Sequence, residues 1–196
     1  MYEAAAAAEL PDEQLADLVS QGDRAAFDSL VRRHHRRVFS ICYRMTGSAQ
    51  EAEDMAQETF FRLYRHRESY QTGRRFKAWL DRICVNVCLT NQQRVRRLGP
   101  VVRLGQTDAS SAAGIATSNP ESLDPEARAG VSELIRSVQK IVTTLPTPYR
   151  AALVLRVFGG LSYQEIADAL ECSIGTVMSR INRARIQVRN HLKDQQ

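Results

Sequence analysis

Residues 161–192 read LSYQEIADALECSIGTVMSRINRARIQVRNHL and contain two helix patterns separated by a short break. The first helix is predicted from Ser162 to Leu170, because Ser162 and Glu165 have the spacing of a capping box. The second is predicted to begin at Ile174. Its apolar stripe consists of Val177, Ile181, Ala184 and Val188. A short bracing helix followed by a longer helix with a polar outer face is typical of a helix-turn-helix.

The polar face of the second predicted helix has the composition that a reader of the DNA major groove needs. It is formed by Gly175, Thr176, Ser179, Asn182, Arg183, Ile186 and Asn190. Ser173 can cap this helix while its free N–H groups meet a DNA phosphate. The guanidinium groups of Arg180 and Arg183 suit both phosphates and base edges. The pattern favours DNA binding, and the alternative is an amphipathic helix hairpin with a solvated basic face.

The rest of the chain also has the pattern of helices, and no segment alternates convincingly with period two. Ser48 and Glu51 form a second capping-box pattern, and Thr147 is expected to cap a helix that has Pro148 at its first position. A run of small and polar residues interrupts the helices near the middle of the chain. We therefore expect an all-α fold with two helical domains and a flexible linker. The expected boundaries are 1–98, 99–123 for the linker, and 124–196 for the helix-turn-helix domain.

The composition is that of an ordinary folded protein with a basic surface. Hydrophobic residues make up 43% of the 196 residues and charged residues 25%, with a formal net charge of +5. These values argue against a disordered chain and favour a polyanionic partner. No stretch approaches the roughly 18 apolar residues of a membrane span, and the first residues lack the pattern of a secretion signal. We expect a cytoplasmic protein without membrane insertion.

The C-terminal motifs resemble region 4 of bacterial sigma factors and are most similar to the extracytoplasmic-function (ECF) group. The resemblance rests on residues 145–156, 160–167 and 175–185. It implies a domain that reads the −35 promoter element and touches the flap of the polymerase β subunit. The residues assigned to the −35 element are Ser173, Thr176, Ser179, Arg180, Asn182 and Arg183. Met178 departs from the family pattern, which often has a basic residue at this position.

A second motif, EAEDMAQETFFRLY at residues 51–64, mixes acidic and aromatic side chains on one predicted helix. An acidic face has the wrong sign for DNA, so it indicates a basic protein partner or plain solvation. The motif resembles ECF sigma region 2.2, which docks on the coiled coil of the polymerase β′ clamp. That resemblance implies that Asp54, Gln57 and Glu58 bind core polymerase. Residues 21–45 resemble region 2.1.

A loop and a basic helix follow at residues 68–97. Aromatic rings beside arginines suit unstacked bases, although Phe76 and Trp79 could instead belong to the core, with the arginines as a solvated flank. The segment resembles ECF regions 2.3 and 2.4, whose loop captures a base flipped from the non-template strand. This implies promoter melting without ATP. The residues assigned to the −10 element are Tyr70, Arg74, Arg75, Asn86 and Thr90.

The remaining motifs give little sign of other chemistry. Cys84 and Cys88 could supply half of a metal site, but no cysteine or histidine lies close enough in sequence to complete it. We therefore expect no metal and no cofactor. The basic run that contains His34 and His35 is expected to form a solvated helix face. Because no nucleophile–base set, P-loop or dinucleotide fingerprint occurs, we do not expect an enzyme.

Two classes of function stay open at this point. The first is a two-domain ECF sigma factor, for which the resemblance implies core RNA polymerase, promoter DNA and an anti-sigma factor as partners. The second is a free-standing helix-turn-helix regulator whose N-terminal domain senses a ligand or dimerises. The acidic–aromatic and arginine–aromatic helices favour the first class, because a simple repressor needs neither.

Overall fold

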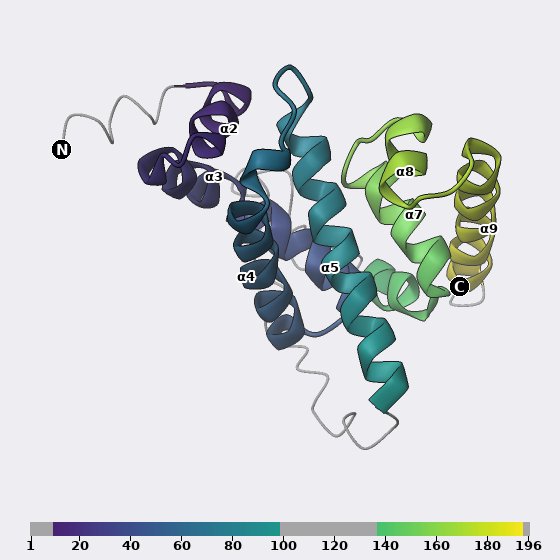
Figure 1. Ribbon diagram of the computed structural model, residues 1–196. Coiled ribbons are helices and arrows are strands. Elements are labelled where there is room, and N and C mark those ends of the chain that lie inside the picture. Colours follow the sequence, from purple (N-terminus) through teal and green to yellow (C-terminus); the bar gives the residue numbers. More distant parts are fainter. Residues whose placement is uncertain (1–9, 99–136, 194–196) are drawn as a thin grey trace, which may run out of the picture.

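The computed structural model describes residues 10–98 and 137–193 (Figure 1). Within these two ranges the regular secondary structure is entirely helical. The N-terminal half contains α2 (Asp12–Ser20), α3 (Arg24–Thr46), α4 (Ala49–Arg65), the 3-10 helix η1 (Arg67–Ser69) and α5 (Phe76–Leu98). The C-terminal half contains helical residues 137–144, α7 (Thr147–Val157), α8 (Tyr163–Ala169) and α9 (Ile174–Lys193). The predicted all-α fold is confirmed. The predicted linker, 99–123, lies outside the described residues.

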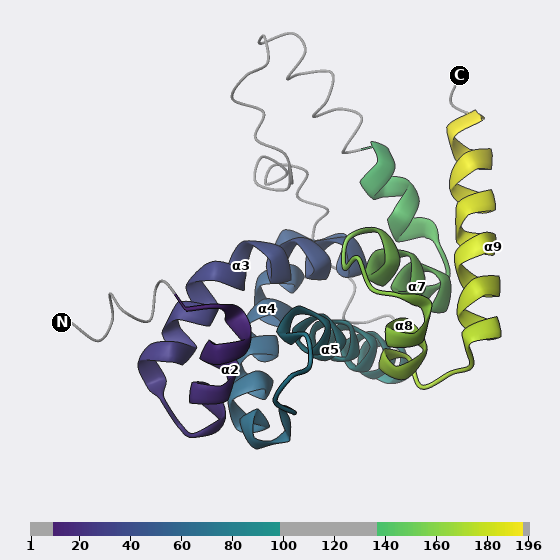
Figure 2. The ribbon, with the colours of Figure 1, turned by 90° about the horizontal axis from the view of Figure 1, so that it is seen from above.

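Short local signals set the helix boundaries of the N-terminal half. The Asp23 carboxylate accepts a hydrogen bond from the N–H of Ala26 at 3.0 Å and so caps α3. Helix α3 ends at Thr46 and is followed by Gly47, whose φ of 81° lies in the left-handed region. Ser48 then caps α4 by accepting a hydrogen bond from the N–H of Glu51. This tight connection folds α4 back along α3, and α5 packs against both helices (Figures 1 and 2).

The C-terminal half contains the predicted helix-turn-helix. Ser162 and Glu165 form the expected capping box at the start of α8. Glu171, with a φ of 50°, lies in the turn between α8 and α9. The residues of the predicted α9 stripe that become fully buried are Val177, Ile181 and Ala184. The apolar side of the motif therefore lies where the 3.6-residue period places it.

The predicted cap at Thr147 is wrong by one residue. Helix α7 begins at Thr147 itself, and Pro146 occupies the cap position without a side-chain hydrogen bond. The Thr147 hydroxyl instead donates to the side-chain oxygen of Gln92 at 2.9 Å and accepts a hydrogen bond from Arg96 at 3.0 Å. Both partners lie on α5, so a contact between the halves takes the place of the local cap.

The two halves pack directly against each other. Arg150 of α7 donates a hydrogen bond to the carbonyl oxygen of Met45 at 2.5 Å. Arg37 of α3 donates to the carbonyl oxygen of Gly159 at 3.0 Å. One apolar core cluster continues from α3 and α5 into α7 and α8. The described parts of the two predicted domains therefore share a core in this structure, which the expectation of two separately tethered globules did not include.

The basic run on α3 is not simply a solvated face. His34 is 5% exposed, and its Nε2 lies 2.9 Å from the Asp12 carboxylate. Burial lowers the pKa of His34, although Asp12 acts to raise it. Arg37 forms two hydrogen bonds to Asp81, which is itself completely buried. His34 therefore connects α3 to α2, and Arg37 connects α3 to α5. The two residues are three positions apart, so both lie on the inner side of the helix.

Candidate nucleic-acid interface

The first turn of α9 is arranged as an anion-binding helix end. The Ser173 hydroxyl accepts a hydrogen bond from the N–H of Thr176 at 3.1 Å and lies 2.8 Å from the Thr176 hydroxyl. Ser179, Asn182 and Arg183 are exposed along the same helix. The macrodipole of α9 adds a partial positive charge at this end. The N-terminus of α9 therefore offers N–H groups that favour a phosphate, and the exposed polar side chains follow further along the helix.

Two arginines of the same helix make contacts within the C-terminal half. The Arg183 guanidinium donates to the Tyr149 hydroxyl of α7 at 3.0 Å. Arg180 is half-buried, and its guanidinium lies 3.6 Å from the sulfur of Cys172. Met178 is 53% exposed on this helix, so the position that departs from the family pattern presents an apolar side chain to solvent.

The loop before α5 holds part of the predicted −10 set. Arg74 and Arg75 are exposed. Tyr70 is only 7% exposed, and its hydroxyl donates to the carbonyl oxygen of Arg74 at 2.6 Å. Its ring lies 5.2 Å from that of Trp79, and burial raises the pKa of Tyr70 to about 12. Tyr70 therefore braces the loop from inside and is not accessible to a base in this arrangement.

The other members of the −10 set lie further along α5. Thr90 is exposed, and its hydroxyl donates to the carbonyl oxygen of Asn86 at 2.8 Å. Asn86 is half-buried. Phe76 is completely buried, as the core alternative requires, whereas Trp79 is half-buried.

Arg75 also contacts the opposite half of the molecule. Its guanidinium lies 3.3 Å from the carboxylate of Glu165 on α8. Burial acts to raise the pKa of Glu165, but hydrogen bonds from Ser162 and the charge of Arg75 hold it below its ordinary value. Arg75, which is predicted to bind the −10 element, is therefore ion-paired with Glu165 on α8, the helix that braces α9.

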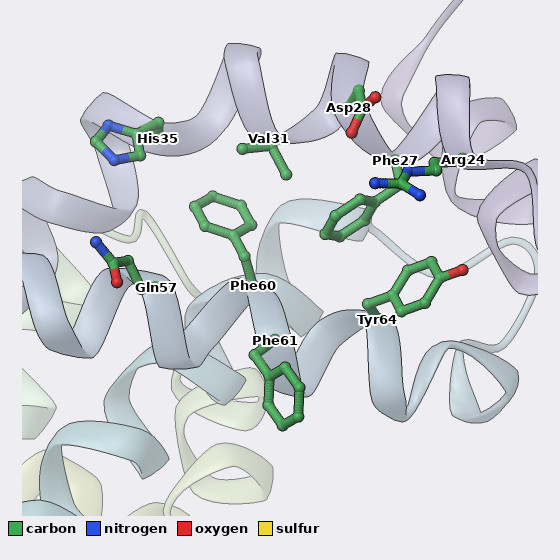
Figure 3. Close-up of a pocket in the computed structure, with 9 residues that line it drawn as sticks. All are labelled: Arg24, Phe27, Asp28, Val31, His35, Gln57, Phe60, Phe61 and Tyr64. Carbon is green, nitrogen blue, oxygen red and sulfur yellow. The ribbon is translucent and has the colours of Figure 1, made fainter.

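The predicted core-polymerase set is divided between two sides of α4. Gln57 borders an apolar groove of about 540 Å³ between α3 and α4. The aromatic side chains in this groove are Phe27, Phe60, Phe61 and Tyr64 (Figure 3). Phe61 is 60% exposed, whereas Phe60 is 6% exposed and belongs to the apolar core cluster. Sequence reasoning missed the groove, because it requires α3 and α4 to lie side by side.

Asp54 and Glu58 border a second depression of about 330 Å³ between α4 and α5. Glu58 is half-buried, and its carboxylate accepts a hydrogen bond from Arg62 at 2.6 Å. Asp54 is exposed. Thr90 lines the same depression, so residues predicted to bind polymerase and residues predicted to bind DNA border one surface.

A cluster of three cysteines is the other feature that sequence reasoning missed. Cys42 of α3 joins Cys84 and Cys88 of α5, and all three sulfur atoms lie within 4.8 Å of one another. Sequence spacing could not reveal the third cysteine, because Cys42 precedes Cys84 by 42 residues. Packing of α3 on α5 brings them together.

Comparison with known proteins assigns both halves to one family. Residues 30–98 match Sigma-70 region 2, and residues 135–188 match Sigma-70, region 4. The chain is 39% identical over 174 residues to the ECF RNA polymerase sigma factor SigE of Mycolicibacterium smegmatis, covering 87% of this chain and 64% of that protein. It is 37% identical to the RNA polymerase sigma-H factor of Pseudomonas aeruginosa, covering 89% and 90% of the two chains.

Solved structures show the same fold. The sigma factor RpoE of Bartonella quintana, solved with the anti-sigma factor NepR, has a TM-score of 0.65 at 24% identity and covers 85% of this chain and 96% of its own. CnrH, solved with the cytosolic domain of CnrY, has a TM-score of 0.63 at 24% identity, covering 94% and 99%. None of the described helices combines the length and apolar character that spanning a membrane requires. On the two family matches and these relatives, the chain belongs to the ECF group of the sigma-70 family, which acts with RNA polymerase in promoter-specific transcription initiation.

Proposed function

We propose that this ECF sigma factor divides its work between its halves in the cytoplasm. Residues 1–98 bind core polymerase and open the −10 element, residues 124–196 bind the −35 element and the β flap, and residues 99–123 connect them. The observation that carries the proposal is the accessible side of α9. The Ser173 cap lies at the N-terminus of this helix, and exposed polar side chains follow along the same helix at Ser179, Asn182 and Arg183.

For the −35 element, the proposed contacts follow from exposure. Ser179, Asn182 and Arg183 lie on the accessible side of α9, so they are proposed to read base edges. Ser173 and Thr176 lie at the helix N-terminus and are proposed to position a phosphate. Arg180, which is half-buried, is assigned to the phosphate backbone.

For the −10 element, Arg74 and Arg75 are proposed to hold phosphates of the displaced strand, and Asn86 and Thr90 to contact bases. This requires Arg75 to exchange its partner Glu165 for DNA, which is inexpensive because Arg75 is 64% exposed. Tyr70 is proposed to contribute by shaping the loop through the hydrogen bond from its hydroxyl to the carbonyl oxygen of Arg74.

For core polymerase, the groove beside Gln57 and the carboxylates of Asp54 and Glu58 are proposed to act together. An apolar groove with an exposed phenylalanine suits the apolar face of a helix, and the acidic side chains suit a basic flank on the same partner. This combination matches the clamp coiled coil that the resemblance implies.

The polymerase contact is tested by the double variant Asp54→Lys/Glu58→Lys. We expect loss of binding to bacterial core polymerase in pull-down and in vitro transcription, with helicity unchanged by circular dichroism. Glu171→Lys, an exposed charge reversal on the C-terminal half, is the matched control and should keep core binding. Unchanged binding by the double variant would count against the assignment of α4.

The −35 contact is tested by Arg183→Ala on promoters with intact and mutated −35 elements. Loss of a base contact should weaken −35-dependent transcription by an amount equivalent to about 1–3 kcal/mol. If a mutated −35 element affects the wild type and Arg183→Ala identically, Arg183 does not read a base. A free-standing regulator would instead bind duplex promoter DNA without polymerase, which an electrophoretic mobility-shift assay measures.

An anti-sigma factor is proposed as a further partner. The Bartonella quintana relative was solved in complex with one, and the exposed Phe61 offers an apolar contact for such a protein. Copurification of this chain with a protein that inhibits transcription, and whose removal restores transcription, would support the proposal. An inhibitor that leaves core binding unaffected would contradict it.

A further inference from the structure

Three buried cysteines converge in the core of the N-terminal half. Cys42 comes from α3, and Cys84 and Cys88 lie one turn apart on α5. All three are 0% exposed, and the sulfur atoms of Cys42 and Cys84 are 3.3 Å apart. With all three sulfurs within 4.8 Å, two helices aim three soft ligand atoms at one point.

The type and number of donor atoms limit what could bind. Thiol sulfur selects soft, thiophilic elements over magnesium or calcium. Structural zinc takes four ligands in a tetrahedron, whereas the cluster found among the described residues supplies three. The neighbouring Thr59 is completely buried, and its hydroxyl already donates to the carbonyl oxygen of Met55 at 2.7 Å. The arrangement therefore suits an element that is satisfied by three sulfurs.

The charge of the surroundings narrows the choice further. Hydrogen bonds with Cys42 and Cys88, together with burial, hold the pKa of Cys84 well above its ordinary value. All three thiols are completely buried in the apolar core cluster of the N-terminal half. A site buried in this way is therefore expected to favour a product that carries no net charge.

The expectation of a product without net charge distinguishes between the soft elements. Three thiolates around Cu(I) carry a net charge of two minus, and three around Zn(II) carry one minus, in an apolar core where uncompensated charge is costly. Three thiolates around a trivalent metalloid carry none. A three-coordinate adduct of that kind also needs no oxygen ligand from water.

We propose that Cys42, Cys84 and Cys88 form a binding site for trivalent arsenic, taken up as arsenous acid. Three S–H bonds and three As–O bonds break, and three As–S bonds form. The three thiol protons leave with the three hydroxyl groups as water, so nothing is oxidised or reduced. The product ties α3 to α5. Because the thiols are buried, uptake requires transient separation of these helices and is slower than at an exposed thiol.

The test uses the full-length reduced protein with arsenite, native mass spectrometry and thermal unfolding. The wild type should gain one arsenic atom and lose three hydrogens. At a hundredfold excess over Kd, its Tm should rise by about 5–10 °C. Cys172→Ala, which removes the half-buried cysteine of the C-terminal half, is the matched control and should behave as the wild type. Cys42→Ala should lose both the three-hydrogen adduct and the rise in Tm.

X-ray absorption on the wild-type adduct keeps the proposal testable even if Cys42→Ala does not fold. Three sulfur neighbours and no oxygen around arsenic would support the site. An oxygen neighbour, an adduct that retains a hydroxyl group, or dependence on Cys172 would overturn it. Equal thermal stabilisation by zinc or Cu(I) would overturn the choice of a trivalent element.

Discussion

Replacing Asp81 by Asn probes the ion pair that joins α3 to α5. The Asp81 carboxylate is completely buried and accepts hydrogen bonds from Arg37 Nε at 3.1 Å and Nη2 at 2.7 Å. The same Nη2 also donates to the carbonyl oxygen of Gly159, so the pair helps to hold the two halves together. Asp81→Asn keeps the shape of the side chain but removes its charge and one acceptor.

The expected cost follows from burial. Breaking a buried ion pair costs about 3–5 kcal/mol. The Arg37 side chain is 29% exposed and keeps its bond to Gly159, so the loss is expected at the lower end, about 3 kcal/mol. If both halves unfold as one unit, the Tm should fall by about 6–12 °C.

Urea unfolding followed by circular dichroism measures this loss. Asp168→Asn is the matched control, because Asp168 is exposed on α8 and its replacement should change the free energy of unfolding by less than about 0.5 kcal/mol. A loss below about 1 kcal/mol for Asp81→Asn would refute the reasoning from burial.

The variant Arg37→Met removes the other member of the ion pair and tests how the loss of stability changes with pH. Burial raises the pKa of Asp81 even though Arg37 acts to lower it. Without Arg37 the pKa of Asp81 should rise further. A carboxyl group with a raised folded-state pKa contributes stability at low pH that is lost as the pH rises. The deficit of Arg37→Met should therefore be larger at about pH 8 than at about pH 5, and equal deficits would show that the buried charge is not its cause.

Two further predictions concern α3. Acidification from about pH 7.5 to about pH 5.5 should lower the free energy of unfolding, because burial lowers the pKa of His34 and the unfolded chain then binds more protons than the folded chain. His34→Gln should flatten this slope in urea titrations, and an unchanged slope would assign it to another group. Gly47→Ala should cost more than Gly22→Ala, by about 1–3 kcal/mol. Both glycines have positive φ, but only at Gly47 would a Cβ meet another side chain, 2.8 Å from Thr143 Cγ2. Equal losses in denaturant unfolding would contradict that contact.

The helix-turn-helix could be predicted closely because its signals are local. The capping box at Ser162 and the 3.6-residue period of α9 act within one or two turns, and both are present in the structure. The error at Thr147 has the opposite origin, since its hydroxyl bonds to Gln92, 55 residues away. Local helix-capping preferences do not include a competing hydrogen-bond partner so far away in the sequence.

The features that could not be predicted all depend on distant segments. The bond from Arg150 to Met45 spans 105 residues, and no local pattern marks Arg150 as half-buried. The sequence placed Tyr70 with accessible arginines, whereas packing against Trp79 turns it inward. The groove beside Gln57 exists because two helices face each other. Site residues could be assigned from motifs, but their accessibility depends on tertiary packing.

The close packing of the halves limits which form of the protein can occupy a whole promoter. Positions −35 and −10 are about 25 nucleotides apart, or about 85 Å of B-form DNA at about 3.4 Å per step. A compact globule of the 146 described residues, 89 in 10–98 and 57 in 137–193, has a radius of gyration of only about 15 Å. Under the proposed function, the halves must part before both elements are filled. The apparent promoter affinity is then reduced by the fraction of molecules in which the halves are separated. The hydrogen bonds between the halves therefore weaken DNA binding by the sigma factor alone.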